Sequence, residues 1–288
     1  RLNPMWFYDE RGSRLFDEIT RLPEYYPTRT ELAILQDNAA AISECCGEGC
    51  VLIEPGSGSS DKVRLLLDAL RPSVYVPVDI SAEFLRDAAA GLGADYPWLP
   101  VHAVCADFNA GWEFLDDVPA GKRVVFYPGS TIGNLEPEAA RAFLKTLADI
   151  IGEDGGALIG VDTHKATPLL DAAYNDAAGV TAAFNLNVLR RLNDLLGADF
   201  DEERFRHHAF YNADRRRIEM HLVSTDGQRV RSRERDFEFA PGETIHTECS
   251  YKYSPEDFAQ LASSAGLAIR QSWLDEAKLF SVHFLTRG

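Results

Sequence analysis

Three acidic residues stand where short apolar segments end, and they are the residues best suited to bind a nucleoside. Glu54, Asp79 and Asp107 each close such a segment. A carboxylate can accept hydrogen bonds from ribose hydroxyls or from an adenine amino group. One such acid alone is better explained as a helix cap or a solvated loop charge. Three at successive strand ends favour a ligand, because open α/β sheets bind ligands at the carboxyl ends of their strands.

A glycine turn directly follows the first of these acids. In Glu54-Pro55-Gly56-Ser57-Gly58, the backbone can approach a ligand closely because glycine has no Cβ. A dinucleotide fingerprint needs a third glycine where this chain has Asp61, and the Gly-Lys-Ser/Thr of a phosphate-binding loop is absent. The remaining pattern fits the S-adenosylmethionine turn of Rossmann-like methyltransferases, which holds one cationic ligand and no pyrophosphate.

An alternation of strand and helix patterns predicts the elements that position these residues. Helices are expected over 31–42, after the glycine turn, after Ser81 as a cap, and over 138–151. Strands are expected over 51–53, 74–79, 101–108, 123–127 and 157–161, and a final hairpin over 267–274 and 278–287. The hairpin resembles the antiparallel edge of a methyltransferase sheet. We therefore predict an α/β fold with a Rossmann-like methyltransferase sheet.

The pattern changes after Asp162, which predicts a second, α+β domain for the substrate. A long helix over 177–196 and β-type stretches over 217–224, 229–239 and 243–253 are expected there. Residues 1–30 are expected to form an aromatic lid rather than a helix. In the last stretch, strict alternation predicts one face for His246, Glu248 and Ser250. The predicted cofactor domain is 31–165 plus 254–288, and the predicted substrate domain is 1–30 plus 166–253.

Composition excludes several classes of partner. The 288-residue chain has a formal net charge of −16, which disfavours nucleic acid as a partner. No apolar run approaches the ~18 residues that suggest a membrane span. The five cysteines are an odd number, and no second Cys/His cluster accompanies the group at 45, 46 and 50. We expect a cytoplasmic protein with reduced thiols and no metal.

Several long strings closely resemble one family, the histidine Nα-methyltransferase of ergothioneine biosynthesis, and the resemblance covers nearly the whole chain. These strings are far more specific than the glycine turn. They are Trp6-Phe7-Tyr8-Asp9, the stretch 21–31 (RLPEYYPTRTE), the stretch 129–135 (GSTIGNL), the stretch 176–185 (DAAGVTAAFN) and Arg217-Ile218-Glu219-Met220.

The resemblance implies a role for each matching residue. It places Tyr25, Asn134 and Tyr174 on the carboxylate and amino end of histidine, and Tyr8 and Phe16 near the methylated nitrogen. Tyr8 and Asn134 are the implied catalytic residues. Glu248 and Ser250 would bind the imidazole, and Thr181 and Met220 would shape the pocket. The implied cofactor-binding residues are Glu54, Gly56, Ser57, Gly58, Lys62, Asp79, Asp107, Phe108 and Gly129.

The expected activity is S-adenosylmethionine-dependent trimethylation of the α-amino nitrogen of L-histidine to hercynine, by a monomer. An N-methyltransferase for another amino acid, such as tryptophan, is the alternative, although Glu248 and Met220 suit an indole poorly. A nicotinamide-dependent oxidoreductase is disfavoured by Asp61. A non-catalytic binding module is disfavoured because many polar residues are predicted to converge on one cleft between the two domains.

Overall fold

The computed structural model of the chain describes Leu2 and residues 4–288, and it divides into two compact units. The core unit consists of Pro27–His164 and Lys252–Gly288. The inserted unit consists of the residues up to Tyr26 and of Lys165–Tyr251. The sequence predicted 31–165 plus 254–288 for the cofactor domain and 1–30 plus 166–253 for the substrate domain.

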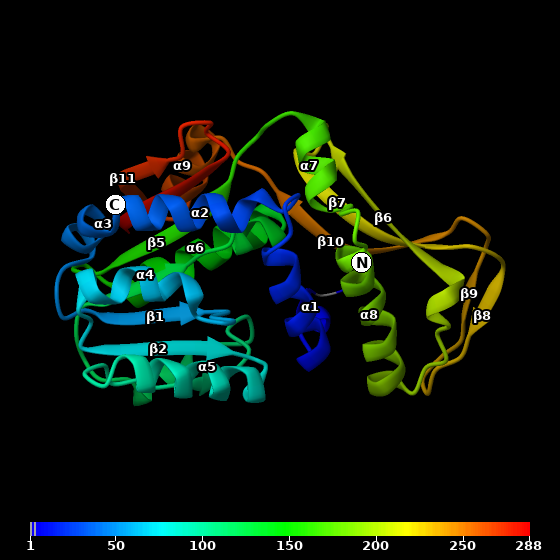
Figure 1. The fold of residues 1–288 in the computed structure, drawn as a ribbon, viewed down its shortest axis with the longest axis horizontal. Coiled ribbons are helices and arrows are strands. Elements are labelled where there is room, and N and C mark those ends of the chain that lie inside the picture. The colour runs from blue at the N-terminus through cyan, green and yellow to red at the C-terminus, as the bar shows by residue number, and fades with distance from the viewer. Residues whose placement is uncertain (1, 3) are drawn as a thin grey trace. The chain divides into compact units, whose positions relative to one another are not determined.

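The core unit is built on a seven-stranded sheet with the order β11-β12-β5-β4-β1-β2-β3. All pairs among β1, β2, β3, β4 and β5 are parallel, whereas β12 pairs antiparallel with both β5 and β11. Figure 1 shows these last two strands, in red, beside the green β5. The predicted α/β class and its antiparallel edge are confirmed. The strands are β1 (Val51–Pro55), β2 (Val74–Asp79), β3 (Val104–Cys105), β4 (Arg123–Tyr127), β5 (Gly156–Asp162), β11 (Leu267–Leu274) and β12 (Phe280–Arg287).

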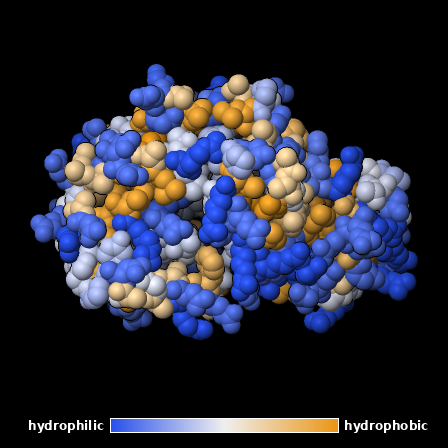
Figure 2. Space-filling model, viewed as in Figure 1, coloured by the Kyte–Doolittle hydropathy of each residue, from blue (hydrophilic) through white to orange (hydrophobic). Residues whose placement is uncertain are grey.

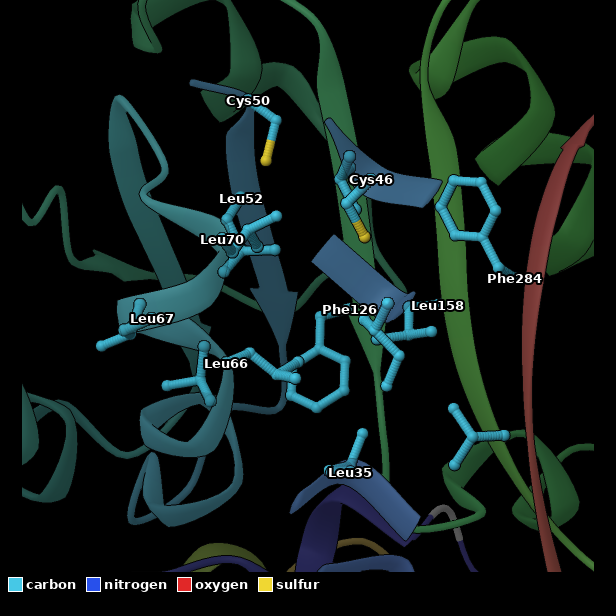
Figure 3. Close-up of a cluster of buried hydrophobic side chains, with 14 of the residues drawn as sticks. Leu35, Cys46, Cys50, Leu52, Leu66, Leu67, Leu70, Phe126, Leu158 and Phe284 are labelled. Carbon is cyan, nitrogen blue, oxygen red and sulfur yellow. The ribbon is translucent and has the colours of Figure 1, made fainter. Parts of the chain in front are cut away.

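Helices of the core unit bury apolar stripes against this sheet. On α4, Val63, Leu66, Leu67 and Leu70 recur at helical spacing and are all buried, as predicted. Figure 3 shows Leu66, Leu67 and Leu70 beside Leu52 of β1 and Phe126 of β4, among buried side chains that also include Phe284 of β12. The helices are α2 (Tyr26–Asp37), α3 (Ala39–Cys46), α4 (Asp61–Leu70), α5 (Ala82–Asp95), η2 (Glu113–Asp117), η3 (Thr131–Asn134), α6 (Pro137–Ile151) and α9 (Pro255–Ser264).

Two predicted elements of the core unit have different bounds in the structure. The helix expected over 31–42 begins earlier, at Tyr26, because Pro27 is tolerated in a first helical turn. It ends at Asp37, and α3 follows after Asn38, whose φ of −117° departs from helical geometry. The strand expected over 101–108 is reduced to the two residues of β3, with an isolated bridge between Tyr75 and Val101.

The inserted unit places α8 beside a three-stranded antiparallel sheet of order β10-β7-β6. Figure 1 shows these elements in green, yellow and orange. The sequence did not predict β6, and the stretch 229–239 forms two short paired strands, β8 and β9, instead of one. The elements are η1 (Pro4–Phe7), α1 (Glu10–Thr20), α7 (Thr167–Ala173), α8 (Val180–Leu196), η4 (Glu202–Arg204), β6 (Phe205–Asn212), β7 (Arg217–Ser224), β8 (Gln228–Val230), β9 (Phe237–Phe239) and β10 (Thr244–Tyr251).

The N-terminal segment is helical, so the prediction of a non-helical lid is wrong for it. Asp9 caps α1, because its Oδ1 accepts a hydrogen bond from the backbone N–H of Gly12 at 2.7 Å. A Cβ at Gly12 would lie only 1.7 Å from the carbonyl oxygen of Phe7, so the entry to α1 needs glycine there. Asn187 of α8 also donates to Asp9, at 2.9 Å, which fixes α1 against α8.

The surface is mainly polar, in keeping with the net charge of −16. In the view of Figure 2, hydrophilic residues predominate and apolar residues lie scattered among them. Among the described residues, no helix has both the length and the apolar character needed to cross a bilayer. All five cysteines are free thiols, as predicted.

Candidate functional site

The glycine turn after β1 adopts the left-handed backbone that its sequence allows. Gly56 and Gly58 have φ values of 70° and 54°, and Ser60 has a φ of 60°. The Gly56 N–H donates to the carbonyl of Val78 at 2.7 Å, which ties the turn to the end of β2. A Cβ at Gly56 would lie 3.8 Å from the ring of Phe108, so that ring is next to the turn. The structure thus brings together the predicted cofactor residues Gly56, Gly58 and Phe108.

Two predicted acidic residues flank this turn and bond to protein groups. Glu54 is 1% exposed, and its Oε2 accepts a short hydrogen bond from the Tyr75 hydroxyl. Burial raises the pKa of Glu54 to about 8, although the bond from Tyr75 opposes this shift. Asp79 accepts from the Gly58 N–H at 3.2 Å and from the Ser81 N–H at 2.9 Å. Asp79 therefore fixes the glycine turn to the start of α5.

Two further details complete this edge of the sheet. Asp107 accepts from the backbone and the side-chain nitrogen of Asn109, at 2.9 and 3.1 Å, in a tight turn beyond β3. Ser81 stands at the start of α5, as expected, but its hydroxyl makes no capping hydrogen bond.

A buried glutamate links two more predicted cofactor residues. Glu31 is fully buried; its Oε2 lies 2.7 Å from the Nζ of Lys62, and both its oxygens accept from the Gly129 N–H at 3.0 Å. A Cβ at Gly160 would lie 1.9 Å from Glu31 Oε1, so β5 needs glycine there. In the sequence, Glu31 is only the last residue of the family string 21–31, and no pattern there indicates this role. Glu31 positions Lys62 and the loop after β4.

The residues around the glycine turn fit a nucleoside with a cationic group. The Ser57 hydroxyl is buried and, among the described residues, has no hydrogen-bond partner. A buried hydroxyl without a partner is costly unless a ligand completes its bonding. Carboxylates at adjacent strand ends supply acceptors for hydroxyl and amino groups. Ser57 and these carboxylates thus offer a nucleoside both a hydroxyl group and acceptors.

In the inserted unit, aromatic side chains predicted to bind substrate form a continuous group. Ring centroids are 5.7 Å apart for Tyr8 and Phe16, 6.4 Å for Phe16 and Tyr25, and 6.1 Å for Tyr25 and Tyr174, with edge-to-face geometry. Phe184 of α8 lies 5.9 Å from both Tyr8 and Phe16. Sequence reasoning assigned no role to Phe184, although it lies in the family string 176–185.

One face of the three-stranded sheet carries the residues predicted to bind the imidazole. Glu248 of β10 is directly opposite Met220 of β7, and Ser250 is opposite Ile218. Residues opposite each other in register point to the same side of a sheet. Glu248, Ser250 and Met220 are all buried. The structure therefore brings these three predicted residues to one face.

The prediction that His246 shares this face is wrong. The register shifts between His246 and Glu248, because a bulge inserts Thr247 and interrupts the alternation. His246 pairs with His221, and the two rings stack with centroids 4.6 Å apart. His246 thus lies on the opposite face of the sheet from Glu248.

The remaining predicted substrate residues, Thr181 and Asn134, come from different units. Thr181 is buried in the first turn of α8, where its N–H donates to Asp176 at 2.8 Å. Asp176 also accepts from the Val180 N–H at 2.8 Å and so satisfies two backbone donors at the helix start. Asn134 ends η3 in the core unit. Its role beside Tyr25 stays a prediction.

The opposite face of the sheet carries a network of charges and stacked rings. Arg217 donates to Glu219 Oε1 at 2.9 and 2.8 Å and to the Tyr251 hydroxyl at 2.7 Å. Glu219 Oε2 lies 3.1 Å from His221 Nε2. Burial alone would raise the pKa of Glu219, but the bonds from Arg217 and His221 outweigh it and lower the pKa to about 2.

Glu219, His221 and His246 also form a cluster of possible metal ligands, within 4.8 Å of one another. Their atoms already have protein partners, because Glu219 Oε2 lies 3.1 Å from His221 Nε2 and His246 Nε2 lies 3.0 Å from the carbonyl oxygen of Glu248. Arg217 already balances the charge of Glu219, and the two imidazole rings lie parallel, so their lone pairs do not converge. We interpret the cluster as an ion-pair and stacking network and assign no metal to it.

Known proteins that resemble this chain are methyltransferases. A family model described as histidine-specific, S-adenosylmethionine-dependent methyltransferase matches residues 1–287. The chain is 47% identical to histidine N-alpha-methyltransferase of Mycolicibacterium smegmatis over 99% of this chain and 90% of that protein. It is 33% identical to ergothioneine biosynthesis protein 1 of Neurospora crassa over 100% of this chain, which spans 33% of that longer protein.

A solved structure shows the same fold at low sequence identity. The CcbJ methyltransferase from Streptomyces caelestis superimposes with a TM-score of 0.51 at 14% identity, over 88% of this chain and 96% of that one. This likeness confirms the predicted Rossmann-like methyltransferase fold. The full-length family match and the relative at 47% identity show more than the fold. The chain belongs to the family of histidine-specific, S-adenosylmethionine-dependent methyltransferases.

Proposed function

We propose that this chain transfers three methyl groups from S-adenosylmethionine to the α-amino nitrogen of L-histidine, giving hercynine for ergothioneine biosynthesis. The observation that carries the proposal is the match of the histidine-specific family over residues 1–287. The named relatives support the substrate and the pathway. We further propose that the enzyme acts as a cytoplasmic monomer without nucleic-acid or membrane partners.

The core unit would hold the cofactor, whose sulfonium supplies an electrophilic methyl group. We propose that Asp79 accepts from ribose hydroxyls, that Asp107 accepts from the adenine amino group, and that Phe108 stacks on the base. Gly56 and Gly58 leave room for close backbone approach. The remaining proposed cofactor residues are Glu54, Ser57, Lys62 and Gly129. Support comes from the partnerless hydroxyl of Ser57 and from the place of Phe108 beside the turn.

The residues proposed for the amino-acid end of histidine are uncharged, which suits the chemistry. The α-nitrogen attacks only as a neutral amine, and a carboxylate in contact with it would stabilise the ammonium form. Tyr25, Asn134 and Tyr174 would bind this end through hydroxyl and amide groups. Tyr8 and Asn134 would orient the nitrogen for in-line attack, because placement alone can contribute ~7–11 kcal/mol. The grouped rings of Tyr25 and Tyr174 support these assignments.

The other end of the substrate would be recognised by buried polar groups. We propose that Glu248 and Ser250 hydrogen-bond the imidazole, while Met220 and Thr181 limit the space around it. Glu248 is 7% exposed, and an apolar ring would offer its carboxylate no hydrogen-bond donor, so such substrates would be disfavoured. The face of Phe16 can stabilise the quaternary product through cation–π contact.

Mass spectrometry of an incubation with S-adenosylmethionine tests the activity. Histidine is expected to gain one, two and finally three methyl groups, and a parallel incubation with tryptophan is expected to gain none. Methylation of tryptophan but not histidine would favour the alternative activity. Thermal shifts with S-adenosylmethionine and with NAD provide an independent control, and stabilisation by NAD alone would overturn the methyltransferase proposal.

A further inference from the structure

A buried hydrogen-bonded chain ends on the backbone of Tyr174. His207 of β6 has its Nε2 2.9 Å from the carbonyl oxygen of Tyr174 and its Nδ1 2.9 Å from the Nδ2 of Asn185. Asn185 belongs to α8 and is fully buried. Its Nδ2 also lies 3.0 Å from the carbonyl oxygen of His221. All of these residues lie in the inserted unit.

The partners determine every hydrogen position in this chain. A carbonyl oxygen only accepts, so His207 Nε2 carries the proton and donates to Tyr174. His207 Nδ1 then presents a lone pair and accepts from the amide nitrogen of Asn185. That nitrogen has two hydrogens, and the second goes to the His221 carbonyl. Burial lowers the pKa of His207, which keeps this neutral tautomer at neutral pH.

The chain ends where the substrate is proposed to bind. Tyr174 follows directly after α7, and its ring lies 6.1 Å from that of Tyr25. Asn185 lies one helical turn after Thr181, next to Phe184 of the aromatic group. Its Oδ1 is buried and has no hydrogen-bond partner among the described residues, so the side chain is held only through its amino group. Because these bonds give the buried Asn185 amide one orientation, the amide fixes the position of the His207 ring.

We propose that Asn185 and His207 are positioning residues for histidine binding, because together they fix the Tyr174 backbone and with it the Tyr174 ring. This inference rests on the proposed function, in which Tyr174 contacts the substrate. Neither residue needs to touch the substrate. Their effect is transmitted through one carbonyl group, so it falls on histidine and not on the cofactor, whose proposed residues lie in the core unit.

The first test is the variant His207→Phe, which keeps a ring and loses both hydrogen bonds. The Tyr174 carbonyl is then left without its donor, and KM for histidine is expected to rise about tenfold. The KM for S-adenosylmethionine is expected to stay within about twofold, because Tyr174 is proposed to contact histidine and not the cofactor. The matched control is His208→Asn, the next residue of β6, which is exposed on the opposite face of the sheet and should leave both constants unchanged.

A conservative variant separates positioning from simple packing. The amide of His207→Gln can still donate to the Tyr174 carbonyl, so its KM for histidine is expected to lie closer to that of the unaltered protein. Equal rises in His207→Phe and His207→Gln would overturn the proposal, as would a fall in melting temperature with both KM values unchanged. If the unaltered enzyme does not methylate histidine, the proposed function fails first; if it does and His207→Phe retains its KM, only the present inference fails.

A third variant gives a pH signature that loss of packing does not produce. In Asn185→Asp, a carboxylate oxygen replaces the donor that faces His207 Nδ1, so the contact is favourable only while the imidazole is protonated. The ratio of variant to unaltered KM for histidine is therefore expected to rise with pH as His207 loses its proton. The other titratable groups that act on His207 are His208 and Asp176, and both are retained. A ratio independent of pH would contradict the proposed contact.

Discussion

The two faces of the three-stranded sheet in the inserted unit use polar side chains from the same strands for different purposes. On one face, Arg217 and Glu219 satisfy each other in a network that needs no ligand. On the other, Met220 and Glu248 lie opposite each other beside α8, where the proposed pocket is formed. The family string 217–220 therefore alternates residue by residue between the ion-pair face and the face of the proposed pocket. Substitutions on the first face should change stability, and those on the second should change substrate use.

The largest effect is expected from Arg217→Met. It leaves the buried Glu219 carboxylate without its main partner, and breaking a buried ion pair in this way costs about 3–5 kcal/mol. Urea unfolding measures this loss. The double variant Arg217→Met/Glu219→Leu should recover much of it, since no uncompensated charge remains. A double variant as unstable as the single one would contradict the ion-pair explanation.

Acid pH is expected to lower the free energy of unfolding by up to about 3 kcal/mol through the protonation of Glu219. The pKa of Glu219 is lowered from its ordinary value of 4.5 to about 2 in the folded protein. Its contribution is therefore complete above pH 4.5 and is lost as the pH falls towards 2. Unfolding at several pH values should show a smaller difference between the unaltered protein and Glu219→Gln at pH ~3 than at pH ~6. A constant difference would show that the pKa of Glu219 is not lowered.

On the proposed pocket face, Glu248→Ala is expected to reduce kcat/KM for histidine about 30-fold. This corresponds to roughly 2 kcal/mol for a lost hydrogen bond to a charged group. Selectivity should relax towards larger apolar amino acids, which competition assays with mixed substrates can measure. Glu219→Gln is the control, because its side chain points to the other face. An unchanged preference for histidine in Glu248→Ala would remove Glu248 from the pocket.

The smallest effect is expected from His246→Gln. Losing the stacked pair with His221 should lower the unfolding free energy by about 0.5–1.5 kcal/mol. The KM for histidine should stay unchanged, because the Gln amide can still donate to the carbonyl of Glu248, which His246 Nε2 contacts at 3.0 Å. A melting curve and steady-state kinetics on one preparation are sufficient. A KM effect larger than the stability effect would mean that the bulge beside Glu248 transmits changes between the two faces.

The sequence predicted well those elements that local pattern determines. The buried stripe of α4 and the glycine turn at Gly56 and Gly58 follow from apolar spacing and turn chemistry alone. Strand β6 was missed because its alternation is irregular and its pairing with β7 provides much of its stabilisation. The bulge at Thr247 leaves no local signal, and it reversed the face expected for His246.

The candidate site was predicted mainly through family resemblance, and its supporting contacts were not. Glu31 binds the Gly129 N–H across 98 residues of sequence, and no spacing rule reaches that far. The bond between His207 and Tyr174 likewise depends on how β6 pairs with β7 and packs on α8. Residues expected to touch ligands can be recognised from motifs, whereas those that orient them emerge only from tertiary packing.

The place of β12 in the core sheet has a consequence for biosynthesis. Among the strands that the structure describes, this one is the last in sequence, yet it lies between β5 and β11 in the sheet. Until residues 280–287 leave the ribosome, β5 presents an open edge, which is the kind of surface on which nascent chains aggregate. The inserted unit combines residues up to Tyr26 with Lys165–Tyr251, so it can fold fully only after residue 251 has been translated. The core sheet is therefore closed on this side only once residues 280–287 have been translated.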